Sequence, residues 1–599
     1  MNDQRRDPST DFRLADPAAF VRNLGQAMEK AAKLATVIAE RKEPIQPPGA
    51  QLESAAKAFG EIARSYLTDP EKLADAQFKL WQQHARLWQS AWKRFLGEDV
   101  EPVVKPDRGD RRFSDPDWEQ NQVFDFLKQS YLITAKWAYD LVIQAKVPDP
   151  HTKHKARFYV EQVANALAPS NFALTNPEVL KLTLATNGEN LVEGLENLLR
   201  DFSEGGGELK IRQTDFSAFA VGKNLALTPG KVVYQNDIIQ LIQYTPTTAE
   251  VYRTPLVIFP PWINKFYILD LNPKKSFIRW AVEQGLTVFV VSWVNPDEAL
   301  ARKTFADYMQ EGILAALSAV EQATGERKVN AIGYCIGGTL LAATLGYMAA
   351  KGDDRIQSAT FFTTQVDFEK AGDLLVFVDE EQVSGVEHSM AERGYLEGKK
   401  MSQAFNMLRS NDLIWSYVIN NYLKGKDPVP FDLLFWNGDP TRMPAATHSF
   451  YLRECYLNNA MTKGTMVLDG VKIDLKKVKI PVYNLGARED HIAPLPSVFR
   501  IGHFLGGDTR LVVSGSGHIA GVINPPEAKK YQYWTNDRPA ASLEDWLKGA
   551  TEHPGSWWPD WLQWVAARSG DKVRARVPGD GQLKPLEDAP GSFVKIRAD

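Results

Sequence analysis

The 599-residue chain lacks several features that define whole classes of protein. It has only two cysteines, Cys335 and Cys455, which excludes a disulfide-stapled fold and a Cys-rich zinc module and suits a reducing cytoplasm. It has no apolar run long enough to span a bilayer, and residues 1–7 are too polar for a secretory signal. The formal net charge of −4 creates no basic field, so nucleic acid is not an expected partner.

Cofactor motifs are missing too. The chain has no glycine-rich phosphate loop and no cluster of residues at metal-ligand spacing, so we expect neither a metal nor a bound cofactor. What it does have is an ordinary globular composition, with 44% hydrophobic and 24% charged residues. At this length we expect two or three domains with large cores.

Residues 1–205 predict an all-helical N-terminal domain. Apolar residues recur at three- and four-residue spacing in four segments, which are 18–39, 52–66, 71–95 and 118–145. A Pro-rich linker, residues 42–49, separates the first two. Trp88, Trp92 and Phe95 fall at helical spacing, which is more typical of a helix-packing face than of a ligand site, although the face could also meet an apolar particle or a partner subunit.

From residue 206 to 599 the pattern changes to short β-rich runs that alternate with helices. The predicted strands are 231–234, 239–244, 255–260, 286–293, 329–333, 358–364, 479–485 and 509–514, with helices at 274–284 and 305–324 among them. Strands that alternate with helices indicate a doubly wound α/β sheet. Residues of about 367–440 interrupt the alternation and are rich in aromatics, so we interpret them as an inserted cap, or lid, subdomain.

The segment from Val329 to Leu340 carries the strongest chemical signal. An apolar strand ends in Gly333-Tyr334-Cys335-Ile336-Gly337-Gly338 and continues as a good helix former, which is the strand–turn–helix context of a nucleophile elbow with sulfur in place of oxygen. The glycines remove Cβ atoms that would collide at so sharp a turn, and the helix N-terminus favours a thiolate. The alternative is a buried structural cysteine beside a glycine-rich turn. The elbow predicts an α/β-hydrolase fold in which Cys335 is the nucleophile.

A cysteine nucleophile that acts on an acyl group needs a base and an orienting acid. His518 follows a late strand in a Gly/Ser-rich loop, and Asp490 follows the strand before it. Both positions fall at the carboxyl edge of the sheet, where this architecture concentrates its chemistry. Glu489 is a competing acid and His491 a competing base, and either predicted residue could instead be an ordinary solvated loop side chain. The order Cys335, Asp490, His518 is that of α/β-hydrolase triads.

An oxyanion hole would complete the site. The amide of Ile336, directly after the nucleophile, is the first candidate donor. The second should come from the loop after the strand at 255–260, where Pro260 and Pro261 lack N–H groups, so Trp262 or Ile263 would have to donate. The same loop could instead only shape a pocket.

Longer motifs add a resemblance to a known family. They are Pro169–Pro177, Pro260–Leu271, Gly333–Gly338, Asn411–Trp415, Phe431–Asp439, Arg488–His491 and Gly517–Pro526. With them the chain resembles a polyhydroxyalkanoate synthase, and its length and separate N-terminal domain resemble class I. The resemblance implies polymerisation of (R)-3-hydroxyacyl-CoA, with 3-hydroxybutyryl-CoA favoured, and release of CoA, which is then a substrate moiety and no cofactor. It also implies a homodimer in the cytoplasm, bound to the surface of polymer granules.

By that resemblance Cys335 carries the acyl group and His518 is the general base. Asp490 either orients His518 or helps to deprotonate the incoming 3-hydroxyl. We expect Trp415, Phe435 and Trp436 to line an apolar channel that limits water at the thioester, or else to form the core of the cap itself. Two other readings stay open: a cysteine-dependent thioesterase or dienelactone-type hydrolase with the same triad, and a non-catalytic protein of the granule surface.

Overall fold

The computed structural model describes residues 12–40 and 49–598, so the polar segment 1–7 and all but Gly49 of the predicted Pro-rich linker lie outside the described residues. The chain divides into two compact units. The helical unit contains Met1–Asp215 and Asn406–Val429, and the α/β unit contains Phe216–Phe405 and Pro430–Asp599. None of the helices in the described ranges has both the length and the apolar character that a bilayer crossing needs.

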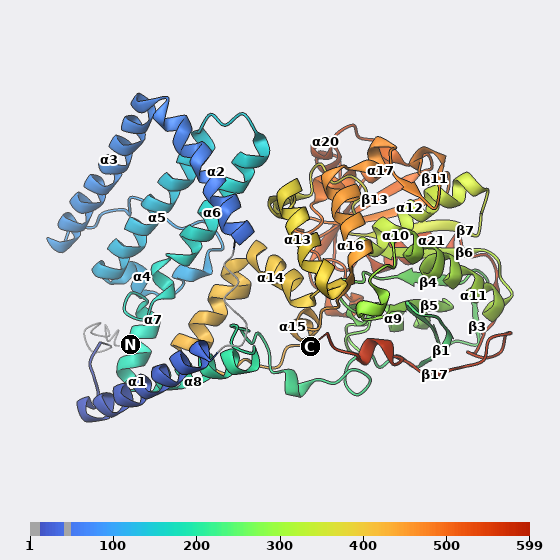
Figure 1. Cartoon of the computed structure of the whole chain (residues 1–599), viewed down its shortest axis with the longest axis horizontal. Helices are drawn as coiled ribbons and strands as arrows, with labels where there is room; N and C mark the ends of the chain where they lie inside the picture. The colour runs from blue at the N-terminus through green and yellow to red at the C-terminus, as the bar shows by residue number, and fades with distance from the viewer. Residues whose placement is uncertain (1–11, 41–48, 599) are drawn as a thin grey trace, which may run out of the picture. The chain divides into compact units, whose positions relative to one another are not determined.

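Helices of very different length make up the helical unit (Figure 1). They are α1 (Pro17–Ala39), α2 (Gly49–Leu67), α3 (Pro70–Phe95), α4 (Asp117–Gln120), α5 (Gln122–Gln144), α6 (Pro150–Ala166), α7 (Pro177–Ala185) and α8 (Glu189–Glu204). Asp or Asn caps that accept hydrogen bonds from first-turn amides begin α1, α3, α5, α6 and α7, and in four of these a proline follows the cap. The predicted helix 118–145 is therefore divided at the Asn121 cap.

The segment Asn406–Val429 belongs to the helical unit although it is distant in sequence from α8. The Tyr422 hydroxyl donates to the buried Asp201 carboxylate at 2.6 Å, and Arg212 pairs with the same carboxylate. A Cβ on Gly194 would lie 1.9 Å from the Tyr422 carbonyl oxygen, so only glycine allows α8 to approach this closely. The sequence predicts a cap at 367–440, and the structure places Asn406–Val429, within that range, in the helical unit. The main division between the units falls at residue 215, whereas the sequence analysis placed it at 205.

An eleven-stranded sheet organises the α/β unit. Its order is β15-β14-β13-β12-β7-β6-β4-β5-β2-β1-β17. Six central strands run parallel to one another, and the strands at both edges are antiparallel. The strand bounds are β1 (Gly230–Gln235), β2 (Ile239–Tyr244), β4 (Leu256–Phe259), β5 (Val288–Trp293), β6 (Val329–Tyr334), β7 (Ile356–Phe362), β12 (Val482–Ala487), β13 (Thr509–Ser514), β14 (Gln532–Thr535), β15 (Thr551–Pro554) and β17 (Glu587–Asp588).

Two apolar cores lie on opposite faces of this sheet. Along β4, Val257 and Phe259 belong to one core and Leu256 and Ile258 to the other, as the two-residue repeat of a strand requires. The helices α11 (Ala315–Thr324) and α12 (Ile336–Lys351) bury their side chains in the first core. The helices α9 (Phe277–Glu283) and α21 (Trp558–Ala566) bury theirs in the second. The result is the three-layer α/β-hydrolase architecture that the sequence predicts.

Candidate active site

Cys335 occupies a sharp turn between β6 and α12. Its backbone has φ +53° and ψ −124°, a region that residues other than glycine seldom adopt. Cys335 is also the N-cap residue of α12. The glycines around it leave room for close packing: a Cβ on Gly337 would lie 2.3 Å from the Phe259 carbonyl oxygen, and one on Gly338 would lie 1.9 Å from Thr364 Oγ1. Cys335 itself is partly exposed, whereas Cys455 is buried.

Asp490 and His518 meet at the carboxyl ends of β12 and β13. His518 Nδ1 lies 2.7 Å from Asp490 Oδ2, and both side chains are buried. The other Asp490 oxygen accepts hydrogen bonds from the amides of Ile492 at 2.8 Å and Ala493 at 2.9 Å, which fix the carboxylate. The Tyr334 hydroxyl donates to the His518 carbonyl oxygen at 3.2 Å, so the residue before the nucleophile also holds the histidine loop.

The pKa of His518 depends on both Asp490 and Cys335. Burial by itself lowers the pKa of the imidazole, but the Asp490 carboxylate and the Cys335 sulfur raise that pKa by more, to about 10. The thiol therefore lies beside the ring that Asp490 holds, and the arrangement favours the protonated imidazolium of His518.

Neither of the competing residues takes part in this contact. Glu489 is exposed, His491 is half-buried, and the carboxylate that contacts His518 is that of Asp490. The structure brings Cys335, Asp490 and His518 together, which is the geometry that a cysteine triad requires.

One candidate oxyanion donor lies in the nucleophile turn, and the other lies in a loop whose first residues pack on that turn. Ile336 is the first residue of α12, where N–H groups have no acceptor inside the helix. Ile263 lies in the loop after β4, and the start of that loop packs on Gly337 through the carbonyls of Phe259 and Pro260. Two sets of backbone N–H groups thus come from the two elements that usually form such a hole.

The predicted channel residues fall in different places. Phe435 and Trp436, on α15 (Asp432–Asn437), are buried in the second core, where Phe435 packs against Phe216 and Phe219. The Trp436 indole donates to the Lys265 carbonyl oxygen at 2.7 Å. Trp415 lies in a π-helix of the helical unit. These positions favour the alternative in which the rings of α15 pack the interior of the α/β unit, while Trp415 belongs to the helical unit.

Sequence reasoning did not single out two tyrosines near the nucleophile. Tyr451 and Tyr456 belong to the π-helix Tyr451–Leu457, and their rings lie 5.3 Å apart. Burial is the main reason that the pKa of each phenol is raised, and the Cys335 sulfur adds to the effect. No local sequence motif marks these two tyrosines, because only the packing of this π-helix brings them near Cys335.

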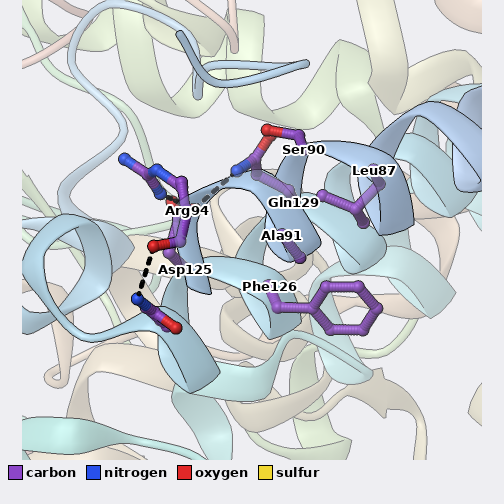
Figure 2. Close-up of a pocket in the computed structure, with 8 residues that line it drawn as sticks. Leu87, Ser90, Ala91, Arg94, Asp125, Phe126 and Gln129 are labelled. Atoms are coloured by element: carbon purple, nitrogen blue, oxygen red, sulfur yellow. Dashed lines mark hydrogen bonds and ion pairs between the residues drawn. The ribbon is translucent and has the colours of Figure 1, made fainter. Parts of the chain in front are cut away.

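Two small cavities in the described part of the chain add no second candidate site. One of about 10 Å³ lies in the α/β unit behind the Ile263 loop, beside Lys265, Trp293 and Thr441. Figure 2 shows another of about 10 Å³ between α3 and α5, where Arg94 pairs with Asp125. Each has room for about one water and none for an acyl chain. Within the described ranges, no three His, Cys, Asp or Glu side chains gather as metal ligands would.

Comparison with protein families gives two matches. Residues 109–281 match the model described as "Poly-beta-hydroxybutyrate polymerase (PhaC) N-terminus". Residues 255–525 match the α/β-hydrolase fold. The first match spans the end of the helical unit and the start of the sheet, and the second covers the residues that carry Cys335, Asp490 and His518.

Curated relatives match almost the whole chain. The poly(3-hydroxyalkanoate) polymerase of Methylorubrum extorquens is 53% identical over 100% of both chains. The polymerase subunit PhaC of Rhizobium meliloti (strain 1021) is 52% identical over 97% of this chain and 96% of its own. Among solved structures, a hydrolase from Pseudomonas aeruginosa PA01 is 12% identical with a TM-score of 0.30, over 50% of this chain and 94% of that one.

Proposed function

We propose a reaction for this chain on the premise that it belongs to the poly(3-hydroxyalkanoate) polymerase family and is an acyltransferase. The substrate is an (R)-3-hydroxyacyl-CoA, with 3-hydroxybutyryl-CoA the favoured monomer, and the products are polyester and free CoA. The acyl chain is carried on Cys335 as a thioester. The observation that carries this proposal is the contact of 2.7 Å between His518 and Asp490 beside the Cys335 sulfur.

In the first step the Cys335 thiolate attacks the thioester carbonyl carbon. The negative charge that develops on the carbonyl oxygen is received by the amides of Ile336 and Ile263. The bond from carbon to the CoA sulfur breaks, and the leaving sulfur takes the proton of the His518 imidazolium. One thioester replaces another, so the acyl group keeps most of its reactivity for the next step.

In the second step the 3-hydroxyl of another acyl-CoA attacks the acyl-enzyme. His518 takes the hydroxyl proton, the oxygen forms an ester with the acyl carbon, and the bond to Cys335 breaks to restore the thiolate. Asp490 orients His518 and stabilises its positive charge, a role supported by its contact with Nδ1 and by the two amides that hold it. Water competes with the hydroxyl, so we assign the packed rings of Phe435 and Trp436 to keeping the interior dry.

We extend the proposal to the partners of the enzyme. The product is an apolar polyester, and α3 exposes aromatic rings that include Trp81, Trp88 and Trp92. This face is our candidate for contact with the granule surface in the cytoplasm. A homodimer, as the family resemblance implies, is part of the same proposal, and the enzyme uses no cofactor besides the CoA of its substrate.

The decisive experiment incubates the purified chain with (R)-3-hydroxybutyryl-CoA and follows three readouts: released thiol, insoluble polymer, and the mass of the acylated peptide. We expect acyl groups on the Cys335 peptide and a loss of at least about 10⁴-fold in CoA release for Cys335→Ala. Cys455→Ala is the matched control, because Cys455 is fully buried in the same unit and burial raises the pKa of its thiol. Free hydroxy acid in place of polymer would identify a thioesterase, and acylation elsewhere would refute the mechanism.

A further inference from the structure

A short segment far along the chain holds the loop that follows β4. Asn264 forms an antiparallel bridge with Pro440, and the Thr441 amide donates to the Ile263 carbonyl oxygen at 3.0 Å. The Thr441 hydroxyl donates to the Trp262 carbonyl oxygen. We name Asp439–Arg442 the clamp segment.

The flank of the same loop is anchored by charge. Lys265 Nζ lies 2.8 Å from Asp439 Oδ1, and only 3% and 2% of these side chains are exposed. The Tyr267 hydroxyl donates to the other Asp439 oxygen at 2.9 Å. A buried ion pair with its remaining oxygen satisfied fixes geometry more than it adds net stability. The clamp segment therefore meets the loop at several successive residues.

One of these contacts acts on a single peptide unit. A peptide bond is planar and trans, so the carbonyl of Trp262 and the N–H of Ile263 belong to one rigid plane and point in opposite directions. Thr441 binds the carbonyl of this plane, so the Ile263 N–H is directed away from the clamp segment. Within the described residues this N–H donates no hydrogen bond. A hydrogen bond to the carbonyl also polarises the N–H and makes it a better donor.

The hydrogen bond from Thr441 also distinguishes between the two candidate oxyanion donors, the amides of Ile263 and Trp262. The N–H of Trp262 belongs to the peptide unit of the Pro261 carbonyl, for which the described part of the chain offers no hydrogen-bond donor. Thr441 thus orients the amide of Ile263 and not that of Trp262.

We propose that Thr441 is a positioning residue of the acyl-transfer site, which orients and polarises the Ile263 amide toward the oxyanion through the Trp262 carbonyl. This inference rests on the proposed function. Thr441 is 2% exposed and touches no reacting atom, so it acts only through the backbone of the loop. Its hydroxyl supplies one hydrogen bond, and its own amide keeps the contact with Ile263 when the side chain is changed.

The test replaces the hydroxyl by a methyl group of similar size. For Thr441→Val we expect the kcat of CoA release to fall about 10- to 100-fold with KM changed less than about threefold, because the amide matters most when charge develops on the oxygen. Thr441→Ser keeps the hydroxyl and should retain activity within about threefold of the unchanged chain. Rescue by serine distinguishes the hydrogen bond from mere packing.

A second readout separates the oxyanion from the thiolate. Iodoacetamide alkylates a thiolate by displacement at carbon and develops no oxyanion, so its rate at the Cys335 peptide should stay within about twofold in Thr441→Val. The matched control is Thr447→Val, because the buried Thr447 hydroxyl donates to a different backbone carbonyl, that of Lys303, at 2.6 Å. This variant loses the same kind of hydrogen bond and should keep its acyl-transfer rate.

The outcomes are distinct. Slower acyl transfer at unchanged alkylation, in Thr441→Val alone, supports the positioning role. Equal loss of both rates, or no loss of either, overturns it while the proposed function stands. If the unchanged chain releases no CoA from (R)-3-hydroxybutyryl-CoA, the proposed function fails first and the positioning role fails with it.

Discussion

Two helices of this protein use their apolar residues in opposite ways. In α12, all thirteen residues from Ile336 to Met348 are buried, and the helix has no polar face. In α3, only Leu87 and Ser90 of 26 residues are buried, while Trp81, Trp88 and Trp92 are each more than 60% exposed. A helix that is apolar on every side is typical of a buried core, whereas a helix that exposes large aromatic rings offers a surface on which another molecule can bind.

The units that contain these helices differ in the same way. The α/β unit buries two continuous apolar cores on the faces of its sheet. The helical unit has small apolar clusters and relies on buried polar contacts, such as that of Asp201 with Arg212 and Tyr422. A rigid apolar core can hold a strained nucleophile and a buried charge pair. In the helical unit, the buried Asp201 carboxylate accepts from Tyr422 of a distant segment as well as pairing with Arg212. The comparison predicts that buried charges serve chemistry in one unit and assembly in the other.

Asp490→Asn should give the largest effect and tests the first half of that comparison. We expect CoA release to fall about 10³-fold or more, because His518 loses its orientation and the charge that raises its pKa. The folded pKa of His518, about 10, exceeds the ordinary 6.5, so its stabilising effect is complete below pH 6.5 and is lost as the pH rises toward 10. Titration of His518 by NMR and denaturant unfolding at pH 6 and pH 10 would measure both effects. An unchanged titration would contradict the assignment of Asp490.

Asp201→Asn tests the second half. Asp201 is fully buried, so Asp201→Asn leaves the Arg212 guanidinium without its buried counter-ion and should lower the free energy of unfolding of the helical unit by about 3 kcal/mol. The control is Asp427→Asn, since Asp427 contacts the same arginine but is 71% exposed and should cost less than about 0.5 kcal/mol. Chemical denaturation measures both variants. If Asp201→Asn slowed acyl transfer but left the free energy of unfolding unchanged, the distinction between the units would be wrong.

Trp92→Ala should have the smallest effect on stability. The Trp92 side chain is 63% exposed, so its removal should change the free energy of unfolding by less than about 0.5 kcal/mol. Leu340→Ala in α12 is the contrast: Leu340 is fully buried and its truncation should cost about 2–5 kcal/mol. Urea unfolding of the two variants compares the helices directly, and equal costs would show that α3 is covered in solution.

Several features of the fold and the site were readable in the sequence because their causes are local. The glycines around Cys335 predict the turn, and alternating strands and helices predict the sheet, whose strand at 509–514 has the predicted bounds. Asp490 and His518 could be named because the carboxyl ends of parallel strands share one edge. The predicted helix 305–324 is interrupted by a π-helix, Tyr308–Leu314, which no change in composition marks.

Other features depend on residues that meet only after folding. The sequence left Phe435 and Trp436 either in a channel or in the core of the cap, because aromatic character alone cannot distinguish the two roles, and the structure shows the two side chains buried. The membership of Asn406–Val429 in the helical unit follows from Gly194 and Asp201, more than 200 positions earlier in the chain. Such contacts carry no periodic signal, since each depends on one pair of side chains.

The sequence by itself determined which atoms can do the chemistry: a thiol on a glycine-framed turn, a carboxylate and an imidazole, each at the end of its strand. Only the tertiary structure decided what surrounds those atoms: the Tyr334 hydroxyl donates to the carbonyl of His518, and the Thr441 hydroxyl donates to a carbonyl 179 positions away, in the loop after β4. The physical reason is one of range. Backbone sterics and side-chain periodicity act over a few residues, whereas a hydrogen bond between distant segments exists only once both cores have packed.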